Sequence, residues 1–125
     1  MLTHAFNAMP GIHHRAPGPV LAAAGDRRVV LEVIADGVHL DPHVIKLVFD
    51  SAPGRVALVT DAMAAAGSAD GHYDLGAVSV TVEDGVARAD DTGSIAGSTL
   101  TQDDALRRAV AAAVSYTHLT LPTKA

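Results

Sequence analysis

Hydrophobic and polar positions follow one another along the chain in a way that predicts alternating strands and helices. Residues 29–35 form an almost continuous apolar run, and residues 56–60 form a second one. Such runs are typical of strands that are buried on both faces of a parallel sheet. Between them, Asp41 and Pro42 fit the first positions of a helix, and apolar residues then recur at helical spacing as far as residue 49. The order strand, helix, strand predicts a βαβ unit with a right-handed crossover.

A different pattern follows the second apolar run. Residues 62–72 are rich in alanine and glycine and are expected to form a loop. Polar and apolar residues then alternate over 78–82, as in a strand with one exposed face, and an Asp-Gly pair at 84–85 separates this strand from residues 86–89. Asp-Gly between two such runs is a strong signal for a tight β-hairpin. We therefore expect a hairpin that is inserted after the second buried strand.

Two more helices are predicted, one towards each end of the chain. Residues 20–24 fit a short helix that a glycine ends. Residues 100–115 fit a longer helix, with Thr99 and Gln102 as a capping box at its start. After this helix the composition changes abruptly, because threonine and leucine alternate over 115–125. We interpret that last stretch as a tail that is foreign to the fold or disordered.

Composition excludes several classes of protein. The 14 acidic and 9 basic residues give a net charge of −5, and no cluster of lysine and arginine resembles a nucleic-acid-binding surface. The sequence has no cysteine and therefore no disulfide bond. No apolar run approaches the roughly 18 residues of a membrane helix, and the start of the chain lacks the features of a signal peptide. We expect a cytoplasmic protein that binds neither nucleic acid nor membrane.

The candidate functional residues stand where the predicted strands end. His4 follows the short apolar start of the chain, Asp36 and His39 follow the first buried run, and Asp61 follows the second. Because the strands of an α/β barrel end at one rim, these side chains are expected to meet there. His4 is either a metal ligand or an ordinary histidine. Asp61 is either a partly buried general base and acid or a turn residue, and Asp36 either contacts a substrate or caps a turn.

Two loops carry further candidates. Asn7 offers an amide that can bind a hydroxyl or a carbonyl group. Arg15 lies in a loop rich in proline and glycine, and its guanidinium suits a phosphate as well as it suits solvent. Residues 95–99 open a helix with exposed amides, which either bind an anion or carbonyl oxygen or serve only as a helix start.

Four short segments together resemble a known family. They are Thr-His-Ala-Phe-Asn-Ala-Met-Pro at 3–10, Ile-Ala-Asp-Gly-Val-His at 34–39, Leu-Val-Thr-Asp-Ala at 58–62 and Ala-Gly-Ser-Thr-Leu at 96–100. In this order and at these intervals they resemble the C-terminal half of the catalytic barrel of the N-acetylglucosamine-6-phosphate deacetylases, a family of metal-dependent amidohydrolases. The resemblance covers residues 2–114.

The resemblance implies a fold and a division of the chain. The fold is α/β, formed by the last strands of a partial (β/α)8 barrel of the TIM type, with the β-hairpin as an insertion. Residues 1–114 would be the C-terminal part of the catalytic barrel, and residues 115–125 the tail. A complete barrel needs about 250 residues, so a chain of 125 residues supplies only part of one.

The resemblance also implies a role for individual residues. His4 would be a metal ligand, and Asp61 the catalytic acid and base. The residues that would contact the substrate are Asn7, Ala8, Arg15, Asp36, His39, Ile95, Ala96 and Gly97. Among these, Arg15 would hold the 6-phosphate, in some members of the family across a dimer interface.

The reaction implied by the resemblance removes the acetyl group from N-acetylglucosamine 6-phosphate and yields glucosamine 6-phosphate and acetate. The implied cofactor is a divalent metal ion, zinc in the first place and iron or another divalent metal as alternatives. Members of the family take a glutamate and another histidine from earlier strands as further ligands, so we expect this chain alone to be inactive. The implied partners are the phosphorylated amino sugar and, in the full-length enzyme, a second copy as a homodimer.

Two other interpretations remain open from the sequence. The chain could belong to another amidohydrolase that acts on a cyclic amide or a nucleobase. It could also be a non-catalytic α/β module that binds a phosphorylated ligand. Metal content separates the enzymes from the binding module, and substrate profiling separates the two enzymes.

Overall fold

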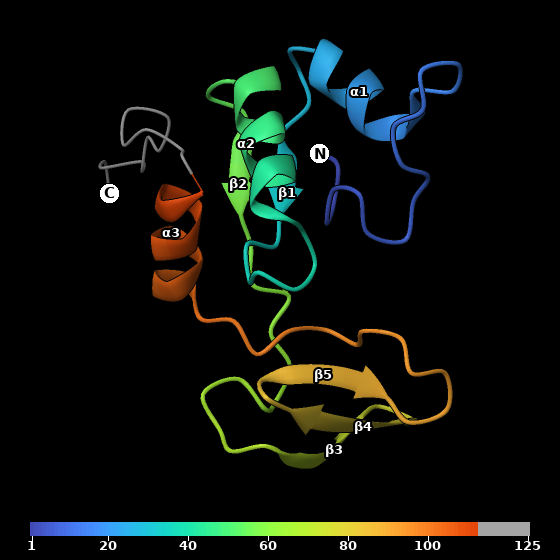
Figure 1. Cartoon of the computed structure of the whole chain (residues 1–125), viewed down its shortest axis with the longest axis vertical. Coiled ribbons are helices and arrows are strands. Elements are labelled where there is room, and N and C mark those ends of the chain that lie inside the picture. Colours follow the sequence, from blue (N-terminus) through green and yellow to red (C-terminus); the bar gives the residue numbers. More distant parts are fainter. Residues whose placement is uncertain (113–125) are drawn as a thin grey trace.

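The computed structural model describes residues 1–112, which form a small α/β body and a separate antiparallel sheet beneath it in the view of Figure 1. The elements of the body are helix α1 (Gly18–Gly25), strand β1 (Leu31–Val33), helix α2 (Pro42–Ser51), strand β2 (Val56–Leu58) and helix α3 (Gln102–Ala111). The elements of the antiparallel sheet are β3 (Gly71–Leu75), β4 (Val78–Glu83) and β5 (Val86–Ala89). The predicted tail at 115–125 lies outside the described residues.

Strands β1 and β2 pair in parallel, with Leu31 opposite Val56. Helix α2 connects them, so the βαβ unit predicted from the sequence is confirmed. The start of the chain adds a third parallel segment, because Leu2 forms a bridge with Leu31 and its amide donates to the carbonyl oxygen of Val30 at 2.8 Å. β1 is therefore the central strand. Both regular strands are shorter than the apolar runs that predicted them, at 29–35 and 56–60.

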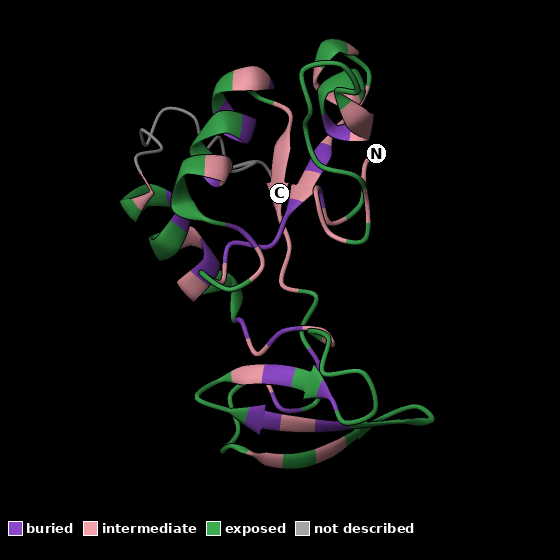
Figure 2. Ribbon diagram, turned by 45° about the vertical axis from the view of Figure 1, so that its right-hand side comes forward, coloured by how far each residue is buried: buried purple, intermediate pink, exposed green. Residues whose placement is uncertain are grey.

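The main core lies between this sheet and the helices α1 and α2. Figure 2 shows the buried residues of β1 and of the inward face of α2. The large buried side chains of this core are Val20, Leu31, Val33, Leu40, Ile45, Val48 and Phe49. Helix α2 begins as predicted, with Asp41 as N-cap accepting a hydrogen bond of 2.8 Å from the amide of His43. An aromatic-poor sequence thus packs mainly through aliphatic residues.

The predicted hairpin is confirmed as β4 and β5, joined by Asp84 and Gly85, which both have positive φ angles (50° and 74°). The carboxylate of Asp70 accepts hydrogen bonds from the amides of these two residues, at 2.7 and 3.2 Å. The loop predicted for 62–72 was right only in part. Strand β3 begins at Gly71 and pairs with β4, although its polar sequence carries little strand signal.

The predicted capping box at the last helix is wrong. Helix α3 begins at Gln102 with Thr101 as its N-cap residue, two residues later than expected. The hydroxyl of Thr99 donates instead to the carbonyl oxygen of Gly85 at 2.6 Å, and the side-chain Nε2 of Gln102 donates to the carbonyl oxygen of Leu58 at 2.9 Å. Both side chains therefore connect α3 to other parts of the fold rather than closing its first turn.

The described residues form an α/β piece in which no barrel closes. The α/β class is confirmed, and the partial barrel remains an expectation. No helix within residues 1–112 is long and apolar enough to cross a membrane.

Candidate functional site

A pocket of about 480 Å³ lies at the carboxyl ends of β1 and β2. Four separate parts of the chain form its wall. They are the first loop, the segment after β1, the segment after β2, and the loop before α3. The lining residues are His4, Asn7, Ala8, Ile34, His39, Asp61, Ser94, Ile95 and Gly97. Most residues singled out from the sequence thus line one pocket.

The backbone around this pocket is strained. His4, Ala8 and Asp61 have φ angles of 37°, 57° and 48°, and Phe6 between the first two has 73°. Residues other than glycine rarely adopt such angles, and they persist only where the surrounding structure holds them. Strained positions cluster at active sites and ligand clamps. The strained backbone and the candidate side chains therefore point to the same functional site.

His4 has an unpaired polar atom. Its Nδ1 is buried and has no hydrogen-bond partner among residues 1–112. A buried polar atom without a partner is costly, and metal coordination is one way of satisfying it. The chemistry of His4 thus fits one ligand of a metal ion. However, the described residues contain no group of three His, Cys, Asp or Glu side chains that could hold a metal. A catalytic zinc site needs about three protein ligands, so residues 1–112 fit part of such a site and not a complete one.

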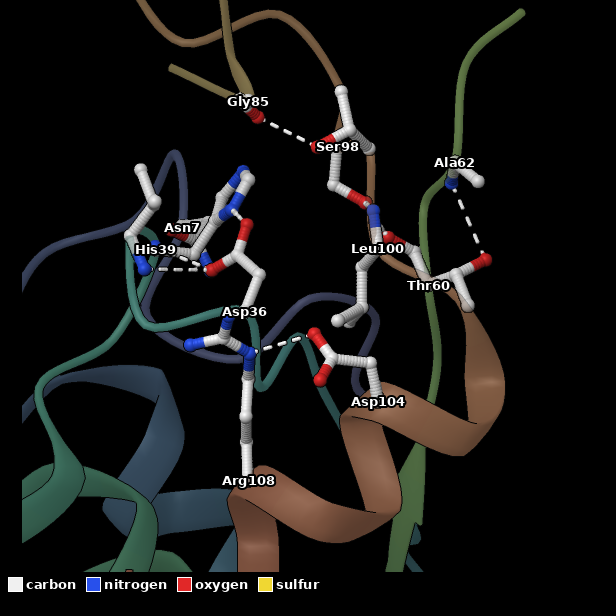
Figure 3. A network of polar contacts seen from close by, with 12 residues as sticks. Asn7, Asp36, His39, Thr60, Ala62, Gly85, Ser98, Leu100, Asp104 and Arg108 are labelled. Atoms are coloured by element: carbon white, nitrogen blue, oxygen red, sulfur yellow. Dashed lines mark hydrogen bonds and ion pairs between the residues drawn. The ribbon is translucent and has the colours of Figure 1, made fainter. Parts of the chain in front are cut away.

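Asp36 contacts His39 (Figure 3) and is not among the residues that line the pocket. One carboxylate oxygen accepts from the amides of Val38 and His39 at 2.9 and 2.8 Å, and the other contacts Nδ1 of His39 at 2.6 Å. Of the alternatives that the sequence left open for Asp36, turn capping is confirmed. Both oxygens already have partners within the protein.

The charge of Asp36 decides which nitrogen of His39 carries a proton. Burial raises the pKa of Asp36, but hydrogen bonds from the His39 ring and from the amides of His39 and Val38 outweigh burial and bring the pKa below its usual value. Asp36 is therefore ionised at neutral pH and can only accept hydrogen bonds. Nδ1 of His39 must donate, and Nε2 is the nitrogen left for a ligand.

Asp61 lines the pocket and is exposed. The partly buried side chain that the sequence suggested as one alternative is therefore wrong for the structure of residues 1–112. The backbone of Asp61, in contrast, is firmly held. The carbonyl oxygen of Asp61 accepts from the amide of Ser98 at 2.8 Å, and Gly97 has a φ angle of 67°. A Cβ atom at position 97 would stand 3.2 Å from the carbonyl oxygen of Asp61, so glycine permits this close approach.

The structure does not bring every expected residue into the pocket. Arg15 is exposed in its loop, and its guanidinium contacts Nε2 of His14 at 2.8 Å. Ala96 packs against the antiparallel sheet, and its amide donates to the carbonyl oxygen of Ala87 at 3.0 Å. Neither residue lines the pocket.

Three residues at the site were missed from the sequence. Ile34 and Ser94 line the pocket, and Ser98 is buried beside Asp61. Ile34 was treated as part of a strand, and Ser94 and Ser98 as parts of a loop rich in small residues. Only the position of Ile34 near the end of the apolar run, two residues before Asp36, gave a signal that could have identified it.

Comparison with known proteins relates the chain to one group of enzymes. No protein-family model matches the sequence. The N-acetylgalactosamine-6-phosphate deacetylase of Escherichia coli O157:H7 is 47% identical over 109 residues, which cover 87% of this chain and 29% of that protein. The N-acetylglucosamine-6-phosphate deacetylase of Vibrio furnissii is 42% identical over 100 residues, covering 80% of this chain and 25% of that protein.

Solved structures agree with the sequence relatives. A variant of N-acetyl-D-glucosamine-6-phosphate deacetylase from Mycobacterium smegmatis, in complex with N-acetyl-D-glucosamine 6-phosphate, superimposes with a TM-score of 0.87 at 45% identity and covers 92% of this chain and 30% of its own. The Thermotoga maritima N-acetylglucosamine-6-phosphate deacetylase gives a TM-score of 0.84 at 40% identity, covering 93% and 32%. The chain thus spans roughly a third or less of these relatives and belongs to the N-acetylhexosamine-6-phosphate deacetylase family.

Proposed function

We propose that this chain forms part of an enzyme that hydrolyses the acetamide of N-acetylglucosamine 6-phosphate and releases glucosamine 6-phosphate and acetate. The observation that carries the proposal is the shared pocket, which is lined by a histidine with a buried, unpartnered Nδ1, a second histidine held by a carboxylate, and an exposed aspartate on a strained backbone. Membership of the deacetylase family supports it.

Asp61 would act as general base and then as general acid. Its carboxylate accepts a proton as a water molecule attacks the acetamide carbon, and it returns that proton to the nitrogen as the carbon–nitrogen bond breaks. A positioned proton-transfer group of this kind contributes about 10² to 10⁴ in rate. The exposure of Asp61 to the pocket fits this role, because both water and substrate can reach the carboxylate.

His39, Asn7 and the loop at 94–97 would bind the sugar. Nε2 of His39 is the ring nitrogen left for a substrate oxygen, since Asp36 occupies Nδ1. The side-chain amide nitrogen of Asn7 donates to the carbonyl oxygen of Ala5 at 3.2 Å, so its side-chain oxygen and its second N–H are the groups that it would offer. Ala8, Ile95 and Gly97 would provide the remaining wall of the pocket.

His4 would be a ligand of a divalent metal ion, as its buried Nδ1 without a partner suggests. The chemistry that such an ion supplies when bound is a lowered pKa of water and a polarised carbonyl group. The other ligands would come from outside residues 1–112, because the described residues hold no group of three. Substitution of His4 by alanine is expected to lower metal content measured by elemental analysis, and full occupancy in that variant would remove His4 from the ligand set.

Arg15 would bind the 6-phosphate from another copy of the chain. It is exposed and does not line the pocket of its own chain. A homodimer in which the loop at 10–19 reaches the neighbouring pocket would reconcile this position with a phosphate-binding role. Guanidinium groups suit this role because they donate two parallel hydrogen bonds to phosphate oxygens.

The proposal is tested in an exchanged enzyme, defined here as the M. smegmatis deacetylase in which residues 2–112 of this chain replace the segment that they match. The expected result is acetate release from N-acetylglucosamine 6-phosphate that the same enzyme with Asp61→Asn does not give. Release of ammonia or ring opening of cyclic amides would favour another amidohydrolase. A well-folded exchanged enzyme without any hydrolysis would favour the binding module.

A second substrate deserves a direct comparison, because the Escherichia coli relative that is 47% identical is an N-acetylgalactosamine-6-phosphate deacetylase. The two sugars differ only in the orientation of one hydroxyl group, at carbon 4. The assay should therefore measure kcat/KM for both sugar phosphates in parallel. A higher value for the galacto sugar would assign that sugar as the substrate while leaving the deacetylation itself unchanged.

A further inference from the structure

Ser98 is a buried polar residue, 2% exposed, in the loop before α3, where it forms a bridge with Ala62. Its hydroxyl donates to the carbonyl oxygen of Thr60 and accepts from the amide of Leu100 at 3.2 Å. Its own amide donates to the carbonyl oxygen of Asp61 at 2.8 Å. All polar atoms of the side chain are therefore used within the protein, and none is left for a ligand.

These bonds hold Asp61 from both sides. The carbonyl oxygen of Thr60 belongs to the peptide unit before Asp61, and the carbonyl oxygen of Asp61 to the peptide unit after it. One residue, Ser98, binds both oxygens. The two peptide units that flank a residue define its φ and ψ angles, and these angles set the direction in which its Cβ points.

Asp61 needs such support because its φ angle is 48°. A residue with a Cβ atom leaves this region readily unless the surrounding structure holds it there. Gly97 allows the close approach, since a Cβ atom at that position would stand 3.2 Å from the carbonyl oxygen of Asp61. Gly97 thus allows the loop to come close to the strained backbone of Asp61, and Ser98 forms the hydrogen bonds to it.

We propose that Ser98 is a positioning residue that fixes the direction of the Asp61 carboxylate within the pocket, an inference that rests on the proposed role of Asp61 as acid and base. Ser98 does not act on the substrate itself. It keeps Asp61 in its strained conformation, so that the carboxylate faces the pocket before the substrate arrives. A displacement of about 1 Å in a reacting group can lower a rate by about 10²-fold.

The neighbouring residue offers a matched control. Thr99 also donates its hydroxyl to a backbone carbonyl distant in sequence, that of Gly85, at 2.6 Å. Its bond connects the hairpin turn to the loop before α3 and does not touch Asp61. Removing the Thr99 hydroxyl deletes its bond to Gly85, whereas removing the Ser98 hydroxyl deletes its bonds to the carbonyl oxygen of Thr60 and the amide of Leu100. Only the change at Ser98 removes a bond to a peptide unit that flanks Asp61.

Kinetics of the exchanged enzyme test the proposal. Ser98→Ala is expected to lower kcat by about 10- to 100-fold with KM within about twofold, whereas Thr99→Ala keeps kcat within about twofold. In an Asp61→Asn background, Ser98→Ala should cause no further loss, because the group that it positions is gone. Equal kcat for Ser98→Ala and the unsubstituted enzyme, or an additive loss in the Asp61→Asn background, would overturn the proposal.

Hydrogen exchange provides a readout that does not depend on activity. In the 125-residue chain and in the exchanged enzyme, Ser98→Ala should accelerate exchange of the amide at position 98 and of Met63, which donates to the carbonyl oxygen of Ser98 at 2.9 Å. Thr99→Ala should leave both amides protected. Unchanged protection in Ser98→Ala would refute the positioning role. An inactive exchanged enzyme that still shows this difference in exchange would count against the proposed function alone.

Discussion

The two ends of the parallel sheet differ in how completely their polar groups are satisfied. At the amino ends of β1 and β2, Arg55 donates hydrogen bonds to the carbonyl oxygens of Ala24, Asp26 and Val29 at 2.6 to 2.8 Å. At the carboxyl ends, His4 has a buried nitrogen without a partner among the described residues, and several residues have positive φ angles.

Size does not distinguish the two ends. The amino ends also border a cavity, of about 580 Å³, lined by Ala24, Gly25, Arg27, Ser51, Pro53 and Arg55. Its polar lining consists of Arg55, whose guanidinium already donates to backbone oxygens, and of the side chains of Arg27 and Ser51. In α/β barrels the amino ends of the strands serve stability and the carboxyl ends serve catalysis. Incomplete satisfaction and strain, rather than volume, identify the functional end here.

The largest effect is expected from Asp61→Asn at the carboxyl ends. In the exchanged enzyme it should lower kcat by about 10² to 10⁴, because an amide cannot accept the proton of the attacking water. Thermal stability should change little, since the side chain is exposed. Asp84→Asn is the control, because Asp84 also has a positive φ angle, of 50°, but lies in the hairpin turn. Near-normal turnover in Asp61→Asn would remove Asp61 from the chemistry.

Arg55→Met should show the opposite behaviour at the amino ends. It removes the Arg55 donor from three backbone carbonyl groups, of which only that of Asp26 keeps another bond within the described residues, from the amide of Val29, and should cost about 2–4 kcal/mol of unfolding free energy, measured by urea denaturation. kcat per folded molecule should be unchanged. Arg28→Ala is the control, since it breaks an ion pair with Asp26 in which the Arg28 side chain is 88% exposed. A large loss of kcat in Arg55→Met would contradict the division between the two ends.

Arg15→Ala should discriminate between substrates. Loss of charge-assisted hydrogen bonds of about 1.5–3 kcal/mol each should raise KM for the 6-phosphorylated sugar by tenfold or more. KM for the unphosphorylated sugar should change far less. Arg27→Ala, an exposed arginine near the amino ends, should affect neither sugar. The same increase for both sugars would show that Arg15 does not bind phosphate.

The smallest effect is expected from Asp36→Asn, and it should depend on pH. The pKa of Asp36 is lowered in the folded protein, so its contribution to stability is present above the unfolded pKa of about 3.9 and is lost as pH falls through the folded value. Asp36→Asn should therefore cost about 1 kcal/mol at neutral pH and nothing in strong acid. Asp41→Asn, at an exposed Asp-His pair in which asparagine still caps the helix, is the control. An equal cost at all pH values would exclude ionisation of Asp36 as the cause.

Regular patterns made much of the fold predictable from sequence. The Asp41-Pro42 start of α2 and the Asp-Gly turn of the hairpin are local signals, because neighbouring residues decide them. Strand β3 was missed because its residues gain their place only by pairing with β4. The start of α3 was misplaced because Thr99 and Gln102 bind distant carbonyl groups instead of their own helix.

The site shows the same contrast between features that local sequence decides and features that distant contacts decide. His4, His39 and Asp61 were predictable because they follow strands, and strand order determines which rim they share. The place of Asp36 outside the pocket lining and the burial of Ser98 depend on three-dimensional packing between segments far apart in the chain. A sequence can indicate which groups meet at a rim more readily than which groups hold them there.

The antiparallel sheet has one further consequence, which concerns how such proteins diversify. The chain leaves the parallel sheet at Ala62 and returns at Ser98, and these two residues form a parallel bridge. An excursion whose ends already meet can be lengthened at little entropic cost, since doubling a loop adds only about 0.6 kcal/mol. Insertions, deletions and exchanges within β3, β4 and their connecting turns can therefore accumulate without displacing Asp61, as long as the pocket residues Ser94, Ile95 and Gly97 keep their places. The antiparallel sheet is thus a segment in which new loops can arise beside an unchanged pocket.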